Sequence, residues 1–208
     1  MSERIALVML PGAFIEPPDF AAHGFVKALR RRRLPVDAIA ADLPAHLYLD
    51  GDVSPLLHAQ VMALPVSTQK RIWLLGISLG GLGALLYATA YPERVEGLIL
   101  IAPFLGSRGL VAEVENGGGL NAWQPGTIGP FDYARRLMSV LKRGVPPRLY
   151  IGYGRSDRFA ASSVLLSGAL PPERVIAVEG DHDWNTWERL WDGLLDTQPF
   201  TTEHACAV

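Results

Sequence analysis

Cysteine and charge are both scarce in this chain of 208 residues. Cys206 is the single cysteine, which excludes a disulfide framework and a zinc site built from cysteines. Charged residues make up 19% of the sequence, below the usual share of about 25%, whereas apolar residues reach 49%. With so much apolar surface to bury, the chain is not an intrinsically disordered protein, and its length fits one domain.

Neither sign of charge predominates. Lysine and arginine total 19 against 21 for aspartate and glutamate, so the net charge of −2 gives no indication of a nucleic-acid-binding surface. The N-terminal sequence MSERIALVML is charged at Glu3 and Arg4 and lacks the layout of a signal peptide. We therefore expect a cytoplasmic protein that binds no nucleic acid.

One long stretch carries no charge at all, namely the 21 residues between Arg71 and Glu93. A segment of this length can span the ~30 Å hydrocarbon layer of a membrane, and Gly76 and Gly80 form a GxxxG pattern. The same composition fits a central strand, a tight turn and a helix pressed against a sheet, because each of these is buried. We expect the second arrangement and no membrane span.

The rest of the chain alternates short β-rich apolar runs with longer helix-like stretches, which is typical of a parallel sheet with helices on both faces. The expected strands are 5–10, 36–41, 71–75, 97–102, 148–153 and 174–178. The expected helices are 20–33, 54–64, 79–91, 133–141 and 184–195. We therefore predict one domain over residues 1–208, a three-layer α/β/α sandwich with a mostly parallel central sheet.

The alternation lapses between about residues 106 and 144, where glycines 117–119 precede the helix expected at 133–141. A structureless loop of that length is improbable inside a compact domain. We therefore predict that this segment is a short lid or cap inserted into the domain.

A G-x-S-x-G motif lies inside the uncharged stretch, with Ser78 at its centre. The expected strand before it and the expected helix after it provide the strand–turn–helix context in which such a serine projects its hydroxyl above a sheet edge. A turn with purely structural glycines would give the same letters. Ser78 is therefore a candidate nucleophile that needs partners elsewhere in the chain.

A nucleophilic serine needs a base, and the base needs an orienting acid. The sequence YGRSD places Asp157 just after an expected strand, and GDHDW places His182 after the last strand. Both positions fall at the carboxyl edge of the sheet, where Ser78 also lies and where open α/β folds carry their sites. The sequence thus predicts that the three side chains meet.

Other assignments of these residues remain open at this point. Asp132, Asp181 and Asp183 are alternative acids, and His182 could close a loop or join its two neighbouring aspartates in a metal site. Adjacent side chains point apart, however, and no second histidine pair supports a metal. An orienting acid is expected from a separate loop, which favours Asp157.

With these motifs in place, the chain resembles the α/β-hydrolase superfamily over nearly its whole length. The resemblance rests on GISLG, YGRSD and GDHDW, with weaker similarity in LPGA at 10–13 and DLPAH at 42–46. It implies that Ser78, Asp157 and His182 form a catalytic triad. The backbone N–H groups of Leu79 and of either Ala13 or Phe14 would then stabilise the oxyanion.

The resemblance implies a serine hydrolase that cleaves carboxylic esters of a small-molecule acyl substrate, with neither a metal nor an organic cofactor. An acyltransferase or a thioesterase would use the same triad, and a non-catalytic binding protein on the same fold is a further alternative. Phe104, Trp123 and Phe131 are candidate substrate contacts beneath the predicted lid.

Overall fold

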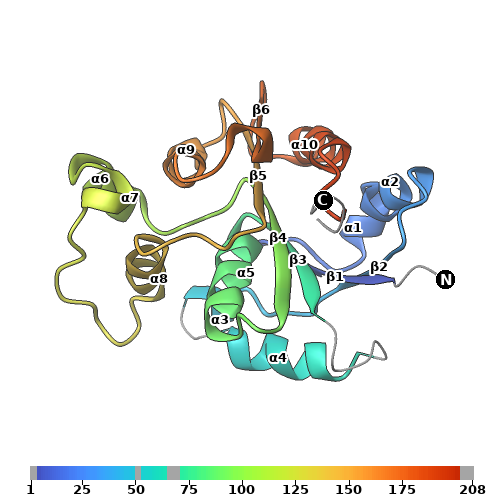
Figure 1. Ribbon diagram of the computed structural model, residues 1–208, viewed down its shortest axis with the longest axis horizontal. Helices are drawn as coiled ribbons and strands as arrows, with labels where there is room; N and C mark the ends of the chain where they lie inside the picture. The colour runs from blue at the N-terminus through green and yellow to red at the C-terminus, as the bar shows by residue number, and fades with distance from the viewer. Residues whose placement is uncertain (1–3, 50–52, 65–70, 202–208) are drawn as a thin grey trace, which may run out of the picture.

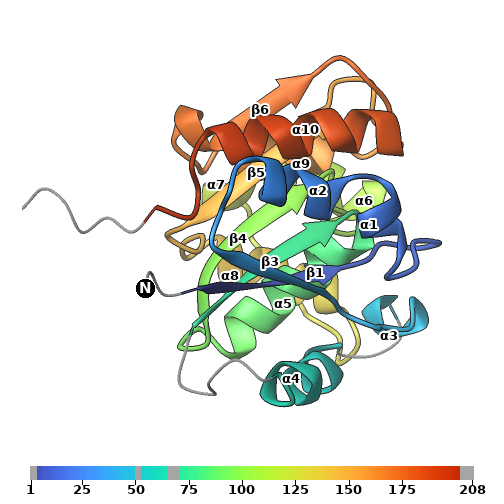
Figure 2. The ribbon, with the colours of Figure 1, turned by 90° about the vertical axis from the view of Figure 1, so that its right-hand side faces the viewer.

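The computed structural model describes residues 4–49, 53–64 and 71–201. Its sheet follows the order β2-β1-β3-β4-β5-β6, and every neighbouring pair is parallel. The strands are β1 (Ile5–Leu10), β2 (Val36–Ala40), β3 (Ile72–Ile77), β4 (Val95–Ile101), β5 (Leu149–Gly154) and β6 (Val175–Val178). The predicted fold class is confirmed, and the arrows of β3, β4 and β6 can be seen to point the same way (Figure 2).

Helices cover both faces of this sheet (Figure 1). On one face lie α1 (Asp19–Ala22), α2 (Phe25–Arg31) and α10 (Trp184–Asp196). On the other lie α3 (His46–Leu49), α4 (Ser54–Met62), α5 (Leu79–Ala90), α6 (Arg108–Asn116), α7 (Gly119–Ala122), α8 (Tyr133–Leu141) and α9 (Ala160–Ser167). A 3-10 turn at Pro172–Arg174 leads into β6.

The central strand β3 shows how the two hydrophobic layers arise. Successive side chains of a strand point to opposite faces. Trp73, Leu75 and Ile77 accordingly belong to the layer beneath α10, together with Trp187 and Trp191 of that helix. The apolar side chains that lie between them on β3 point to the other face and belong to the hydrophobic layer beneath α5. A strand buried on both faces has no position for a charge, which explains the first part of the uncharged stretch.

The second part of that stretch is α5, in which all residues from Leu79 to Ala88 are buried. At ~1.5 Å per residue, its 12 residues cover roughly 18 Å, which is too short for a bilayer. Across the described ranges, no helix is long and apolar enough to cross a membrane. The uncharged stretch is a strand, a turn and a helix, as predicted.

The structure corrects several of the expected elements. The single helix expected at 20–33 is two helices, α1 and α2, because Gly24 adopts a left-handed φ of 78° between them. The segment before residue 133 is more helical than expected, since Ser107 caps α6 by accepting a hydrogen bond from the Leu110 N–H at 3.2 Å. The short α3 and α7 and the later α9 also escaped prediction.

Candidate active site

Ser78 occupies a strained turn between β3 and α5. Its φ of 53° and ψ of −116° are sparsely populated for any residue other than glycine. The turn is fixed by backbone hydrogen bonds, since the Ser78 N–H donates to Ile101 O and the Ser78 carbonyl accepts from the N–H groups of Gly81 and Phe104, all at 2.9 Å. The backbone therefore holds the serine where the motif predicts it.

Both glycines of the motif are required by close backbone approaches. A Cβ at Gly76 would collide with the backbone of Gly80 across the turn. A Cβ at Gly80 would collide with the carbonyl oxygen of Leu10, at the end of β1. The turn around Ser78 between β3 and α5, which we call the elbow, is thus pressed against the β1 loop. A larger residue at either glycine position would have to push the backbone apart.

The structure brings the three predicted triad side chains together. Ser78 Oγ lies 2.9 Å from Nε2 of His182, and Nδ1 of the same ring lies 2.7 Å from Asp157 Oδ2. They follow β3, β6 and β5 respectively, at the carboxyl edge of the sheet. The Asp157 side chain is only 1% exposed and that of His182 only 9%. This geometry allows a proton to pass from the serine hydroxyl to the imidazole.

Asp157 and His182 are held by partners that the sequence did not reveal. The second carboxylate oxygen of Asp157 accepts a hydrogen bond of 2.7 Å from the Phe159 N–H. The imidazole ring packs edge-to-face between Phe159 and Trp187, with centroid distances of 5.0 Å to each. Phe159 therefore fixes both the acid and the ring. Its position two residues after Asp157 is the only signal that could have drawn attention to it.

The alternative acids have other partners. Asp132 accepts hydrogen bonds from the backbone N–H and Nε of Arg135 at the start of α8. Asp183 caps α10 by accepting the Thr186 N–H at 2.9 Å, and hydrogen bonds from Thr186 lower the pKa of this carboxyl. Asp181 is exposed. Within the parts of the chain that the structure describes, there is no cluster of three metal-ligating side chains.

The loop after β1 lies beside Ser78. Gly12 approaches so closely that a Cβ there would be 3.0 Å from both Ile77 O and Ser78 Cβ. The two following residues, Ala13 and Phe14, are exposed, and Phe14 adopts a φ of 61°. Neither of their N–H groups donates a backbone hydrogen bond within the described residues. Leu79 is the first residue of α5, where an N–H has no acceptor inside the helix.

A cavity of about 630 Å³ lies between the start of α5 and the helices α6 and α8. Two of the three expected substrate contacts, Phe104 and Phe131, line it, and so do Tyr48 and Leu82. Trp123 does not line this cavity. It is only 2% exposed and belongs to the hydrophobic core, and its indole N–H donates to Glu113 Oε1 at 3.0 Å.

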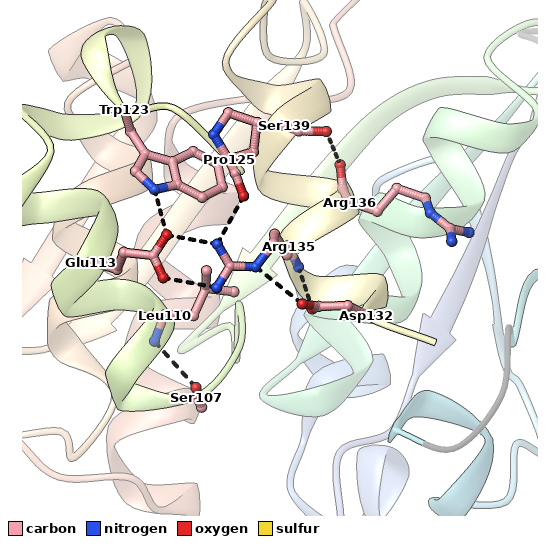
Figure 3. A network of polar contacts seen from close by, with 9 residues as sticks. All are labelled: Ser107, Leu110, Glu113, Trp123, Pro125, Asp132, Arg135, Arg136 and Ser139. Atoms are coloured by element: carbon pink, nitrogen blue, oxygen red, sulfur yellow. Dashed lines mark hydrogen bonds and ion pairs between the residues drawn. The ribbon is translucent and has the colours of Figure 1, made fainter. Parts of the chain in front are cut away.

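Arg135 forms one wall of the cavity and ties α6 to α8 (Figure 3). Its guanidinium donates to both carboxylate oxygens of Glu113, at 2.6 and 2.8 Å, and also to Asp132 and the Pro125 carbonyl. Hydrogen bonds from Arg135 and Trp123 lower the pKa of Glu113 to about 2. All three guanidinium nitrogens of Arg135 thus donate to the protein itself, and the network braces the cavity wall.

Comparisons with known proteins agree with the fold. The family model described as "Serine aminopeptidase, S33" matches residues 52–130, a segment that holds the elbow but neither Asp157 nor His182. No curated protein sequence matches the chain. Solved structures match over nearly its whole length.

The fluorophosphonate-binding serine hydrolase F of Staphylococcus aureus is 15% identical, with a TM-score of 0.69 over 97% of this chain and 86% of that one. An S-formylglutathione hydrolase from the same organism is also 15% identical, with a TM-score of 0.67 over 95% and 85%. The thioesterase domain from the curacin biosynthetic pathway is 12% identical, with a TM-score of 0.55 over 96% and 92%. At such identities the likeness lies in the fold.

Proposed function

We propose that the chain is a serine hydrolase of the α/β-hydrolase superfamily and that it cleaves carboxylic esters through an acyl-enzyme intermediate; the family-model match over the elbow and the likeness in fold to serine hydrolases support this. The observation that carries this proposal is the hydrogen-bonded chain from Ser78 through His182 to the buried Asp157. A structural serine on a turn needs neither the strained φ of 53° nor a histidine backed by a carboxylate.

In the proposed first half-reaction, Ser78 Oγ attacks the ester carbonyl carbon while its proton moves to Nε2 of His182. The tetrahedral intermediate collapses when this proton passes to the leaving alcohol, which leaves the acyl group on Ser78. A water molecule then gives its proton to His182 and attacks the acyl carbon, which releases the acid and restores the serine. Asp157 keeps the Nδ1 proton of His182 in place and stabilises the imidazolium.

The negative oxygen of each tetrahedral intermediate would be held by backbone N–H groups. Leu79 supplies one of them, with the positive end of the α5 dipole behind it. Ala13 or Phe14 supplies the other, and this role is supported because, among the described residues, neither N–H donates to a backbone carbonyl. No metal or organic cofactor takes part in the scheme.

We further propose that residues 106–144 act as the lid of the site and that the neighbouring cavity receives part of the substrate. The Phe104 N–H binds the Ser78 carbonyl, so the cavity wall is attached to the elbow itself. Phe131, which also lines the cavity and is 72% exposed, offers an apolar surface to an entering substrate.

The function can be tested with p-nitrophenyl esters of increasing acyl length. We expect the wild-type protein to hydrolyse them and Ser78→Ala to lose turnover by several orders of magnitude. Ser139→Ala, which removes a serine hydroxyl from α8, is the matched control and should retain wild-type rates. Turnover that survives in Ser78→Ala would contradict the proposal.

A thioester substrate is the second candidate, because two structural neighbours bear the names of an S-formylglutathione hydrolase and a thioesterase domain. The same triad would serve, with a thiol in place of the alcohol as the leaving group. An oxygen ester and a thioester of the same acyl group, compared by kcat/KM, distinguish the two. A ratio that favours the thioester after correction for its uncatalysed hydrolysis would assign the enzyme to that class.

A further inference from the structure

Tyr48 links the loop after β1 to helix α5, although it lies far from Ser78 in sequence. Its side chain is 1% exposed, and its hydroxyl donates a hydrogen bond of 3.0 Å to the carbonyl oxygen of Pro11. Burial raises the pKa of this hydroxyl, so it stays protonated and remains a donor. The interaction is therefore present throughout the working pH range of a hydrolase.

The Tyr48 ring is placed by a gap that glycine leaves in α5. A Cβ at Gly83 would lie 2.5 Å from Cε1 of the ring, so any other residue there would displace the tyrosine. The same ring lines the cavity beside Leu82 and Phe104. The Tyr48 ring thus packs against α5, the helix that begins just after Ser78.

The Pro11 carbonyl lies one peptide unit before the N–H group of Ala13. This carbonyl is pressed against the elbow, because a Cβ at Gly80 would lie only 2.8 Å from the Pro11 oxygen. A buried carbonyl that loses its hydrogen-bond partner is costly, and the loop would shift to find another. Such a shift would rotate the next peptides, which carry the Ala13 and Phe14 N–H groups.

We propose that Tyr48 is a positioning residue for the oxyanion hole, whose hydroxyl fixes the Pro11 carbonyl and so aims the N–H groups of Ala13 and Phe14 at the reacting centre. The inference rests on the proposed function, because it concerns the same site. Nothing in the triad itself requires this tyrosine. Its effect should appear in the transition state and not in the binding of substrate.

The test compares Tyr48→Phe with Tyr87→Phe. Both changes remove one buried tyrosine hydroxyl on the same face of the sheet, and that of Tyr87 lies 3.1 Å from His58 Nδ1, away from the β1 loop. In each variant the ring remains to fill its space. We expect both to fold, with comparable losses in the midpoint of thermal unfolding.

For Tyr48→Phe we expect kcat to fall by roughly 10- to 100-fold, with KM changed by no more than about twofold. Affinity for an alkyl boronic acid, whose adduct on Ser78 mimics the tetrahedral intermediate, should fall by a similar factor. Tyr87→Phe should keep wild-type kcat and boronate affinity. A purely structural role for Tyr48 predicts instead that the two variants behave alike.

Two outcomes would overturn the proposal in distinguishable ways. If the wild type hydrolyses esters and Tyr48→Phe matches it in kcat and boronate affinity, Tyr48 does not position the oxyanion hole, while the proposed function stands. If the folded wild type neither turns over any ester nor binds the boronic acid, the proposed function fails and the role of Tyr48 fails with it.

Discussion

Replacing Asp157 by asparagine tests the assignment of the orienting acid. Asparagine has the same shape, and its carbonyl oxygen can still accept the Phe159 N–H, which Asp157 Oδ1 accepts at 2.7 Å. Its amide nitrogen would then face Nδ1 of His182, where Asp157 Oδ2 now lies at 2.7 Å. Because an amide donates hydrogen bonds, the imidazole would have to accept on Nδ1 and carry its proton on Nε2.

In that tautomer, Nε2 points a proton at the Ser78 hydroxyl and cannot accept one. The equivalent change in a serine protease lowers kcat by about 10⁴-fold, and we expect a loss of the same size here, which corresponds to about 5 kcal/mol of barrier. Stability should change little, since the Phe159 hydrogen bond and the packing against Trp187 remain. The kcat of the variant is measured from initial rates on p-nitrophenyl acetate, and circular dichroism checks that the variant is folded.

Asp183→Asn is the matched control for this experiment. Asp183 also neighbours His182 in sequence, but its carboxylate caps α10, and asparagine caps a helix about as well. We expect wild-type kcat in this variant. Asp157→Asn with more than about a tenth of the wild-type kcat, or an equal loss in Asp183→Asn, would refute the assignment of the acid.

Two further predictions concern the cavity wall and the elbow. Arg135 and Trp123 lower the pKa of Glu113 from 4.5 to about 2, so this carboxylate stabilises the fold above about pH 4.5 and loses that effect as the pH falls towards 2. The melting temperature of Glu113→Gln should therefore lie below that of the wild type at pH 7, and the gap should shrink on acidification; a constant gap would contradict this. Gly80→Ala should lower the free energy of unfolding in urea by about 1–3 kcal/mol or more, because its methyl group would collide with the Leu10 carbonyl. A variant with an unchanged urea midpoint would contradict this prediction.

The fold and the meeting of the triad residues could be predicted from the sequence because both depend on short-range signals. A buried strand, a glycine-flanked serine and a following helix are contiguous in the chain. The parallel-sheet rule then places the ends of separate strands at one edge, so Asp157 and His182 could be matched to Ser78 without coordinates.

The supporting contacts could not be predicted, because each depends on how the folded elements and loops lie against one another. The hydrogen bond from Tyr48 to Pro11 spans 37 residues, and the packing of Trp187 on His182 depends on how α10 lies against the sheet. Trp123 was expected to contact the substrate, but its burial and its bond to Glu113 depend on helices α6 and α7, which were not predicted. Cys206 lies outside the described residues.

The central claim is that Ser78 is an activated nucleophile, and covalent labelling with a fluorophosphonate probe tests it most directly. Intact-mass spectrometry of the folded wild type should show one adduct, peptide mapping should place it on Ser78, and Ser78→Ala should remain unlabelled. Asp157→Asn should label far more slowly than Asp183→Asn. A folded wild-type protein that takes up no probe, or a Ser78→Ala variant labelled as fast as the wild type, would contradict the account.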